Sequence, residues 1–285
     1  MTWTDRHDDR QQDDMRPYDM QQSRPTKSDT ARRAPLRSSL RAHLYCLPHA
    51  GGTAHIFRQW PTLLRADIDI RALDYPGHGR KIGLPVLDTI ERIACSVADE
   101  IMSRPLDRPY ALFGHSMGSL VAFETCHMLA ARNVDMPSLL IACGHRAPRI
   151  PRLSPTMADA PHAEFVAHLR ELGATPPEVF SAPDLLELIL PVLRTDFRAC
   201  ETYAPPHRPR LPVPMVVYGG LGDEDTSRDT LQAWQEETAG SCTVRMFAGG
   251  HFFINGCANQ VISALERDLT DVLATEQIAP CAAMR

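Results

Sequence analysis

The stretch that decides the fold is Tyr110-Ala-Leu-Phe-Gly-His-Ser-Met-Gly118, which is followed by an apolar run as far as Asn133. Its first residues predict a strand, Gly-His-Ser-Met-Gly predicts a sharp turn, and residues 119–133 predict a helix. Glycines flank the serine because side chains would clash in so tight a turn. A G-x-S-x-G turn between strand and helix exposes a serine hydroxyl at the carboxyl edge of a sheet, so Ser116 is a candidate nucleophile.

A serine hydroxyl is a weak nucleophile unless a base and an orienting acid lie beside it. Residues 213–220 predict a strand and lead into the acidic loop 221–225, while residues 243–247 predict another strand and lead into His251. Serine, acid and histidine therefore follow one another along the chain, each in a loop after a strand. This order is typical of the α/β-hydrolase fold.

Composition excludes several classes of function. The chain has 285 residues and a formal net charge of −5, which argues against nucleic acid as a partner. No apolar run approaches the roughly 18–20 residues that span a bilayer, and the N-terminus lacks the apolar core of a signal peptide. We therefore expect a cytoplasmic protein with no membrane partner. The eight cysteines are scattered without a C-x-x-C pair, so we expect them to be structural and reduced.

Four composition changes divide the chain. Residues 1–40 contain no Ile, Val or Phe and predict a disordered polar extension, because they cannot bury enough apolar surface. Residues 41–147 alternate strand and helix patterns, which predicts the first part of an α/β core with a mostly parallel sheet and helices on both faces. Residues 209–275 predict the second part of this core, and 276–285 a C-terminal tail.

The intervening residues, 148–208, show no convincing strand. A helix is predicted from 163 to 172, ending at Gly173, and a second with Asp184 as its N-cap. Pro191 should kink or restart that second helix. Such a helical insertion between the serine and the acid predicts a lid over the active site. The alternative is an extra helical layer that does not move.

Several motifs together resemble those of a type II thioesterase, the free-standing α/β-hydrolase that edits nonribosomal peptide and polyketide assembly lines. The resemblance covers about residues 43–275, and the motifs in the insertion are narrower than the serine turn, which also fits esterases and lipases. These motifs are Pro48-His-Ala-Gly-Gly52, Gly114-His-Ser-Met-Gly118, Leu172-Gly-Ala-Thr-Pro-Pro-Glu-Val179, Leu193-Arg-Thr-Asp-Phe-Arg198 through Glu201-Thr-Tyr203, and Gly249-Gly-His-Phe-Phe253.

The resemblance implies an acyl-thioester substrate and, as partners, the acyl or peptidyl carrier protein domains of NRPS/PKS assembly lines. The phosphopantetheine arm belongs to the carrier, so no cofactor of the enzyme is implied. We expect a monomer. The chain departs from the family in its long polar extension and in Glu224, where proline is frequent. Counting along the acidic loop favours Asp223 as the catalytic acid, with Asp225 as the alternative.

The expected mechanism assigns a role to each residue. Ser116 attacks the thioester carbonyl, His251 takes and returns the proton, and Asp223 orients the imidazole. The N–H groups of Met117 and Ala50 are the expected oxyanion donors. His49 could be an alternative base, but its place before Ala50 favours a role in shaping the loop. No metal is expected, because no tight grouping of ligands occurs.

Apolar residues of the insertion, with two residues near the catalytic motifs, are the candidates for binding the acyl group. They are His49, Phe165, Leu169, Leu186, Ile189, Leu193, Phe197, Tyr203 and Phe252. An apolar helix face belongs more often to a core than to a ligand site. The alternative functions are a carboxylesterase or lipase acting on oxyesters, an acyltransferase with the same triad, or a carrier-binding module.

Overall fold

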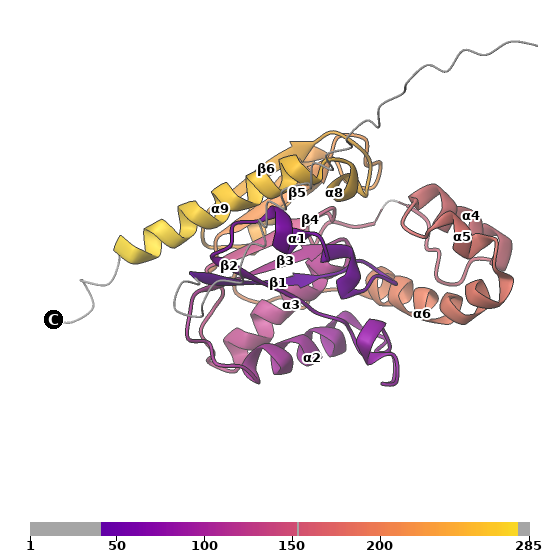
Figure 1. Ribbon diagram of the computed structural model, residues 1–285, viewed down its shortest axis with the longest axis horizontal. Coiled ribbons are helices and arrows are strands. Elements are labelled where there is room, and N and C mark those ends of the chain that lie inside the picture. Colours follow the sequence, from indigo (N-terminus) through magenta and orange to yellow (C-terminus); the bar gives the residue numbers. More distant parts are fainter. Residues whose placement is uncertain (1–40, 153, 279–285) are drawn as a thin grey trace, which may run out of the picture. The chain divides into compact units, whose positions relative to one another are not determined.

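A six-stranded parallel sheet forms the centre of the protein in the computed structural model, which describes residues 41–152 and 154–278 (Figure 1). The spatial order is β2-β1-β3-β4-β5-β6, and every pair of neighbours is parallel. The predicted parallel sheet is therefore confirmed. The strands are β1 (Ala42–Leu47), β2 (Ile68–Ala72), β3 (Tyr110–His115), β4 (Leu139–Cys143), β5 (Met215–Gly220) and β6 (Cys242–Phe247).

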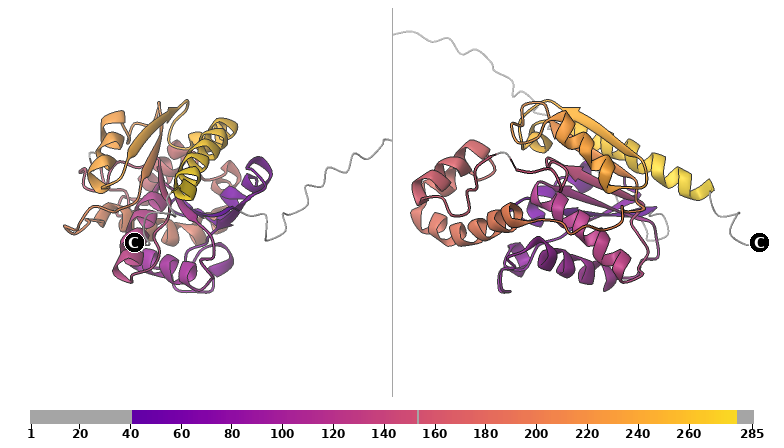
Figure 2. Two further views of the ribbon diagram at one scale, coloured as in Figure 1. Left: turned by 90° about the vertical axis from the view of Figure 1, so that its left-hand side faces the viewer. Right: turned by 180° about the vertical axis from the view of Figure 1, so that it is seen from behind.

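Helices cover both faces of this sheet (Figure 2). One face carries Tyr45 and Leu112 and packs against α2 (Ile90–Met102) and α3 (Met117–Ala131). Residues of opposite parity, such as Phe113, point to the other face, which α1 (Trp60–Leu63) and α9 (Ala258–Ile278) cover. Successive strand residues point to opposite faces, so strands buried on both sides read as continuous apolar runs.

Short elements connect the strands and helices at the edges of the sheet. They are η2 (Ala54–Phe57), η3 (Gly79–Lys81), α7 (Arg228–Gln232), η4 (Ala233–Glu237) and α8 (Phe253–Gly256). The helical pattern in residues 54–64 thus corresponds to two short helices, η2 and α1. Pro61 stands in the first turn of α1, as the ring of proline allows.

The segment between β4 and β5 carries α4 (His162–Leu172), α5 (Pro177–Phe180) and α6 (Pro183–Thr202), which we call the helical insertion. It has an apolar cluster of its own that includes Phe165, Leu186 and Leu190. The predicted end of α4 is confirmed, because Gly173 caps it with a left-handed φ of 73°.

Two details of α6 differ from the prediction. Ala182 is the N-cap, and Pro183 takes the first helical position that suits proline, so Asp184 lies in the first turn and is not the cap. The helix also runs on through Pro191 to Thr202 without restarting. Pro191 and Glu187 are exposed, so the backbone carbonyl that proline leaves without a helical partner can reach water.

Two of the predicted segments lie at the ends of the chain. The extension predicted for residues 1–40 and most of the predicted tail lie outside the described residues. Within them, α9 continues to Ile278, past position 275 where the core was expected to end. No helix in ranges 41–152 and 154–278 combines the length and the apolar character needed to cross a membrane.

The order of the strands places two loops side by side. β1 and β3 are neighbours, and the last residue of β1, Leu47, pairs with Gly114, the residue before the end of β3. The loop after β1 and the turn after β3 therefore leave the same edge of the sheet together. Here the chain also changes direction across the sheet, since β2 lies on one side of β1 and β3 on the other. Open α/β sheets form their binding sites at such a point.

Glycine is required in the turn after β3 by close backbone contacts. A Cβ atom on Gly114 would lie 2.0 Å from the carbonyl oxygen of Gly118, and one on Gly118 would lie 2.2 Å from that of Leu47. Both are far inside van der Waals contact, and the obstacles are backbone atoms of α3 and β1, which cannot move alone.

We therefore expect Gly118→Ala to lower the free energy of unfolding by at least ~3 kcal/mol, or to prevent folding, measured by urea denaturation. Gly256→Ala is the matched control, because a Cβ there meets no atom within 4 Å. It should change stability by less than ~1 kcal/mol. Equal stability of Gly118→Ala and the wild type would contradict the close contact between Gly118 and the backbone of Leu47.

Candidate active site

Ser116 sits at the turn between β3 and α3 in a backbone conformation that few residues adopt. Its φ is 55° and its ψ is −116°, and it is the N-cap of α3. A positive φ at a residue other than glycine is uncommon, and such conformations concentrate at functional sites. The N–H of Ser116 donates to the carbonyl of Cys143 at 2.7 Å, which holds the turn against β4.

The loop after β6 brings His251 to the same edge of the sheet. β5 and β6 are neighbours, and a Cβ on Gly220 would lie 2.5 Å from the carbonyl oxygen of Gly250, so the two loops touch. His115, fully buried, bonds through Nε2 to the carbonyl oxygen of His251 at 3.1 Å. His115 therefore supports the backbone of His251.

Three side chains from three loops form a continuous line of hydrogen bonds. The Nε2 atom of His251 lies 2.9 Å from Oγ of Ser116, and its Nδ1 atom lies 2.9 Å from Oδ2 of Asp223. With Nδ1 donating to the carboxylate, Nε2 can accept the proton of the serine. The arrangement can generate a serine nucleophile.

The carboxyl group of Asp223 is held in its charged form. Its side chain is only 3% exposed, and burial alone would raise its pKa. The hydrogen bond and the charge interaction with His251 outweigh burial and place the pKa of Asp223 below its ordinary value. An ionised Asp223 can therefore face the imidazole throughout the neutral pH range.

The other candidate acid, Asp225, lies elsewhere. It is exposed, and its Oδ1 accepts a hydrogen bond from the hydroxyl of Ser154 at 2.8 Å. Its backbone N–H donates to Oδ1 of Asp223 at 3.2 Å, so Asp225 contributes to the site through its main chain. The structure thus places Asp223, and not Asp225, behind His251.

The loop after β1 runs beside Ser116 and carries a possible second oxyanion donor. Met117 is the first residue of α3, so its N–H has no partner inside the helix. Ala50 makes no hydrogen bond through its N–H among the described residues. His49 bonds through Nδ1 to the carbonyl oxygen of Ala50 at 2.9 Å, and burial lowers the pKa of His49 to about 4. His49 thus shapes the loop.

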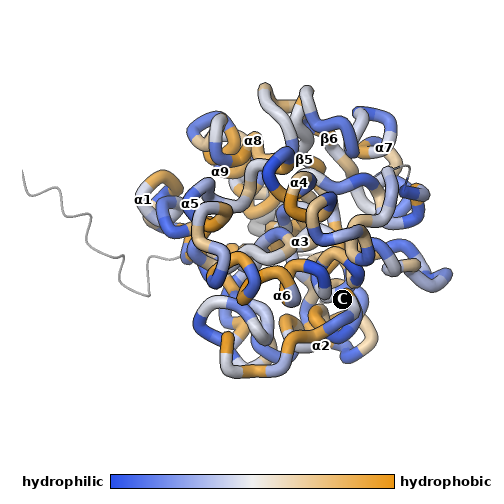
Figure 3. Tube along the Cα trace, turned by 90° about the vertical axis from the view of Figure 1, so that its right-hand side faces the viewer, coloured by the Kyte–Doolittle hydropathy of each residue, from blue (hydrophilic) through white to orange (hydrophobic). Residues whose placement is uncertain are grey.

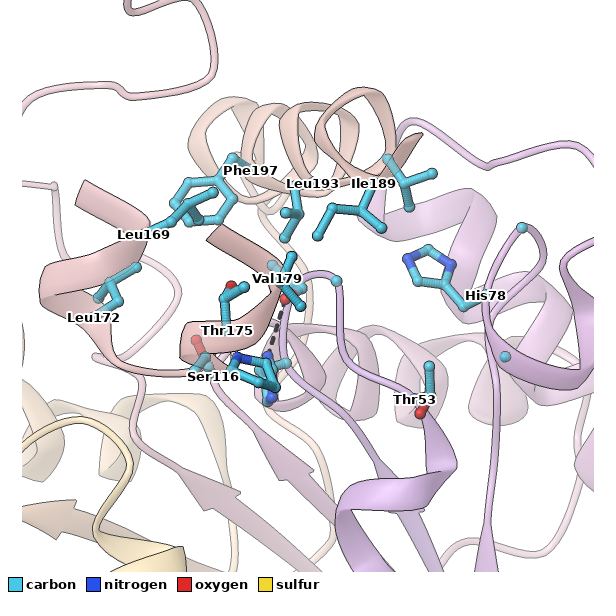
Figure 4. Close-up of a pocket in the computed structure, with 18 of the residues that line it drawn as sticks. Thr53, His78, Ser116, Leu169, Leu172, Thr175, Val179, Ile189, Leu193 and Phe197 are labelled. Carbon is cyan, nitrogen blue, oxygen red and sulfur yellow. Dashed lines mark hydrogen bonds between the residues drawn. The ribbon is translucent and has the colours of Figure 1, made fainter. Parts of the chain in front are cut away.

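A cavity of about 420 Å³ opens on Ser116 and His251 beneath the helical insertion. Figure 4 shows Ile189 and Leu193 projecting into it from α6, with His78 across from them. Of the residues predicted to bind the acyl group, those that line it are His49, Leu169, Ile189, Leu193, Phe197 and Phe252.

Three of the predicted binding residues do not line this cavity. Phe165 and Leu186 belong to the apolar cluster inside the insertion, where they are 0% and 8% exposed. Tyr203 donates its hydroxyl to Glu124 at 2.7 Å and packs against the main core. An apolar helical stripe has the same period whether it faces a cavity or a core, so the pattern alone could not separate them.

Sequence reasoning missed other residues of the cavity. Its floor includes residues from the loops after β1 and β2, and its roof includes the turn between α4 and α5. The residues not predicted are Thr53, Gly77, Gly79, Ile82, Val86, Leu172, Ala174, Thr175, Pro176, Val179, Leu188 and Val192. His78 follows Pro76-Gly77, a position that favours the rim of the pocket, and it does line the cavity, as do Ala50, Gly51 and Ser116. The sequence gives no sign of the residues that were not predicted, because parallel strands bring together loops that are far apart along the chain.

Asp196 was also missed, although the sequence holds a sign of it. It lies three residues after Leu193 on the buried side of α6 and is 0% exposed. Its Oδ2 atom lies 2.8 Å from Nε2 of His78 and accepts the N–H of Gly51 at 2.6 Å. An acidic residue on an otherwise apolar helix face indicates a buried partner.

Among residues 41–152 and 154–278, no group of three or more His, Cys, Asp or Glu side chains is placed to hold a metal ion. The geometry instead defines a class: a parallel α/β sheet with a Ser–His–Asp line at the carboxyl ends of its strands, in the chain order of the α/β-hydrolases.

Comparison with known proteins narrows this class. Residues 42–269 match the family model of the thioesterase domain. The gramicidin S biosynthesis protein GrsT of Aneurinibacillus migulanus is 31% identical over 85% of this chain and 94% of its own. The thioesterase PikA5 of Streptomyces venezuelae is 33% identical over 83% of each chain. The solved structure of YbtT, the type II thioesterase of the yersiniabactin NRPS/PKS pathway, is 31% identical with a TM-score of 0.76, covering 84% of this chain and 97% of that one.

The chain belongs to the thioesterase family. The predicted resemblance to type II thioesterases, the α/β-hydrolase fold and the assignment as a hydrolase are confirmed by these matches.

The choice between the two acids predicts contrasting variants. Asp223→Asn should lower kcat by about 10³–10⁴-fold, because the imidazole loses its orienting charge. Asp225→Asn should stay within about threefold of wild type, because the N–H that it gives to Asp223 is retained. Steady-state hydrolysis of an acyl-N-acetylcysteamine thioester measures both. The reverse ranking would contradict the placement of Asp223.

The buried pair of His78 and Asp196 predicts a pH dependence of stability. Burial lowers the pKa of His78, but the hydrogen bond and charge of Asp196 outweigh it, so the pKa lies above its ordinary value. The resulting stabilisation is fully present below about pH 6.5, the unfolded pKa, and is lost as pH rises through the folded pKa. The difference in Tm between wild type and His78→Gln should therefore shrink as pH rises above about 6.5. A difference that grows with pH would contradict the pairing.

Proposed function

We propose that this thioesterase is a serine hydrolase that removes acyl groups from the phosphopantetheine arms of acyl or peptidyl carrier proteins, as an editing enzyme of NRPS/PKS assembly lines. The observation that carries this proposal is the line from Asp223 through His251 to Ser116, opening directly into an apolar cavity. The line supplies the chemistry and the cavity can receive an acyl chain.

The first step forms an acyl-serine. As Oγ of Ser116 attacks the thioester carbonyl carbon, its proton passes to Nε2 of His251, which lies 2.9 Å away. The carbonyl oxygen becomes an oxyanion, for which the N–H groups of Met117 and Ala50 are the proposed donors. When the intermediate collapses, the carbon–sulfur bond breaks and the imidazolium gives its proton to the thiolate, which leaves as the free arm.

The second step repeats the same chemistry with water. His251 takes a proton from a water molecule, whose oxygen attacks the acyl-serine carbonyl. Collapse of this second intermediate breaks the ester bond, and Oγ of Ser116 regains its proton from His251. The products are a free carboxylic acid and the original enzyme. Throughout, the charged form of Asp223 stabilises the imidazolium that appears in each step.

The helical insertion is proposed as a lid that encloses the acyl group. Leu169, Leu193 and Phe197 reach the cavity from two of its helices. Burying an acyl chain against such side chains gains about 25 cal/mol for each Å² of apolar surface removed from water. It also excludes bulk water from the oxyanion, which strengthens the bonds to its donors.

The rim of the cavity is apolar on the outside as well. Leu188 of α6 is 68% exposed and Ile82, after η3, is 73% exposed, and both also line the cavity. Figure 3 shows apolar stretches of α6 on the side of the insertion. Singly exposed apolar residues are common, but a pair at the mouth of a catalytic cavity suits the approach of a carrier domain that delivers its arm.

The relatives support the pathway by their own roles: GrsT is a gramicidin S biosynthesis protein, and YbtT is the type II thioesterase of yersiniabactin biosynthesis. The absence of a cofactor, the monomeric state and the cytoplasmic location remain predictions from the sequence.

The decisive assay loads a carrier protein with an acyl group and follows its mass. Wild type should release the acyl group and regenerate the free arm, whereas Ser116→Ala should leave the loaded carrier intact, because it lacks the hydroxyl that lies beside His251. The same enzyme should act on p-nitrophenyl esters with lower kcat/KM than on the carrier thioester.

Two outcomes would redirect the proposal. Strong activity on oxyesters with none on loaded carriers would favour a carboxylesterase or lipase. Transfer of the acyl group to an added amine or alcohol, seen as a new ester or amide in place of free acid, would favour an acyltransferase.

A further inference from the structure

The helix α6 touches the loop after β1 at two points on one helical face. A Cβ atom on Gly51 would lie 2.2 Å from Cδ2 of Leu193, so this leucine packs directly on the glycine backbone. Three residues on, Oδ2 of Asp196 accepts the N–H of the same glycine at 2.6 Å. Residues three apart share a face of a helix, so a single docking of α6 makes both contacts.

Asp196 is placed where a carboxylate is costly. It is 0% exposed, and its Oδ2 bonds both Gly51 and His78, while its Oδ1 has no hydrogen-bond partner among the described residues. A buried ion pair with an unsatisfied oxygen is weak evidence for stability, because desolvation opposes the attraction. Its position beside the loop that carries Ala50 points to a functional reason.

The contact holds one peptide group at both ends. In the peptide that joins Ala50 to Gly51, the N–H donates to Asp196 at 2.6 Å and the C=O accepts from Nδ1 of His49 at 2.9 Å. Gly51 has a φ of 69°, a region in which glycine rotates at little cost, so this peptide would be free to turn without its partners. The N–H of Gly52 is also occupied, by the carbonyl of His49 at 2.9 Å.

With these bonds in place, the N–H groups of Gly51 and Gly52 are occupied, whereas that of Ala50 makes no hydrogen bond among the described residues and is left for a ligand. Its N–H belongs to the peptide immediately before the one that Asp196 holds. Turning that second peptide would change the backbone angles at Ala50 and move its N–H away from the reacting carbonyl. An oxyanion donor must lie about 2.7–3.1 Å from the oxygen to act, so a small rotation is enough to remove it.

We propose that Asp196 is a positioning residue for the oxyanion hole, which fixes the N–H of Ala50 through the amide of Gly51. Because Asp196 lies on α6, the hole is aligned only while the helical insertion is seated on the core. This inference rests on the proposed function of Ala50 as a donor. The contact between Asp196 and Gly51 links closure of the helical insertion to formation of the oxyanion, so an enzyme with an open insertion does not activate a carbonyl.

The test compares three replacements of Asp196. Asp196→Ala removes the acceptor, and we expect kcat on an acyl-N-acetylcysteamine thioester to fall by about 10²–10³-fold with KM within about threefold. Asp196→Asn keeps an oxygen that can accept from Gly51, and should retain kcat within about tenfold of wild type. Asp196→Val also removes the acceptor, and it replaces the buried charge with an apolar side chain of similar size. Its kcat should fall as much as that of Asp196→Ala, and it keeps the test available if the alanine variant folds poorly.

A second measurement separates positioning from a general loss of structure. The hydroxyl of Ser116 adds to a trifluoromethyl ketone, its proton passes to His251, and the ketone oxygen becomes an oxyanion, whereas the matching methyl ketone binds without this addition. Asp196→Ala should weaken binding of the fluoroketone by about the factor by which it lowers kcat/KM, and it should change binding of the methyl ketone by less than about twofold.

Asp159→Ala is the matched control. Asp159 lies before α4, is exposed, and pairs at 2.5 Å with Arg198 of α6, the helix that carries Asp196. This variant should keep wild-type values in every measurement. Equal weakening of both ketones by Asp196→Ala, or wild-type turnover in Asp196→Ala and Asp196→Val, would overturn the proposal.

The ketone comparison and parallel rates on p-nitrophenyl acetate keep this test separate from the identity of the substrate. An oxyanion forms on oxyesters and thioesters alike. Failure to hydrolyse loaded carriers would therefore reject the carrier substrate and leave the role of Asp196 to be decided by the ketones.

Discussion

The proposed function of this protein depends on one hydrogen bond, from Oγ of Ser116 to Nε2 of His251. The two residues are far apart in sequence, and the bond exists because the loops after β3 and β6 leave the same edge of a parallel sheet. Each loop is held by backbone contacts that only glycine permits, at Gly114 and Gly118 on one side and at Gly220 on the other. The sheet therefore does more than support the site, because its register sets the distance on which proton transfer relies.

The charge distribution around this bond gives each histidine a different task. Asp223 stays ionised behind His251, so an imidazolium formed there is stabilised. Burial lowers the pKa of His49 and of His115, so both remain neutral near pH 7 and serve as hydrogen-bonding groups that hold backbone. His78 faces a buried carboxylate instead and has a raised pKa. Four imidazoles around one site thus differ because their partners differ.

The sequence could predict the parts of this account that are local. The G-x-S-x-G turn, the strands before each catalytic loop and the glycine end of α4 are encoded in short stretches, and the structure has them where they were expected. Counting along the acidic loop favoured Asp223 as the acid and left Asp225 as the alternative, because a count along the chain does not show which way each of two nearby carboxylates points. The cavity was predicted in part: Leu193 and Phe197 face it, whereas Phe165 and Leu186 fill the interior of the insertion.

Asp196 shows why the rest could not be read in the same way. Its partners, Gly51 and His78, come from loops that precede it by more than a hundred residues, and no pattern in either loop indicates a contact with Asp196. Their meeting depends on how the helical insertion docks, which no local pattern encodes. Such contacts connect the helical insertion to the α/β core. Proteins that share a fold and a mechanism can differ in these contacts, and therefore in how the active site is regulated.

The most direct test of the central claim is covalent labelling with a fluorophosphonate, which reacts with a serine only when a neighbouring base activates it. Peptide mass spectrometry should find one label per chain, on Ser116, in the wild type, and almost none in His251→Ala after the same exposure. Labelling of another residue, or equal labelling of Ser116 in the two proteins, would show that the hydrogen bond between Ser116 and His251 does not create the nucleophile.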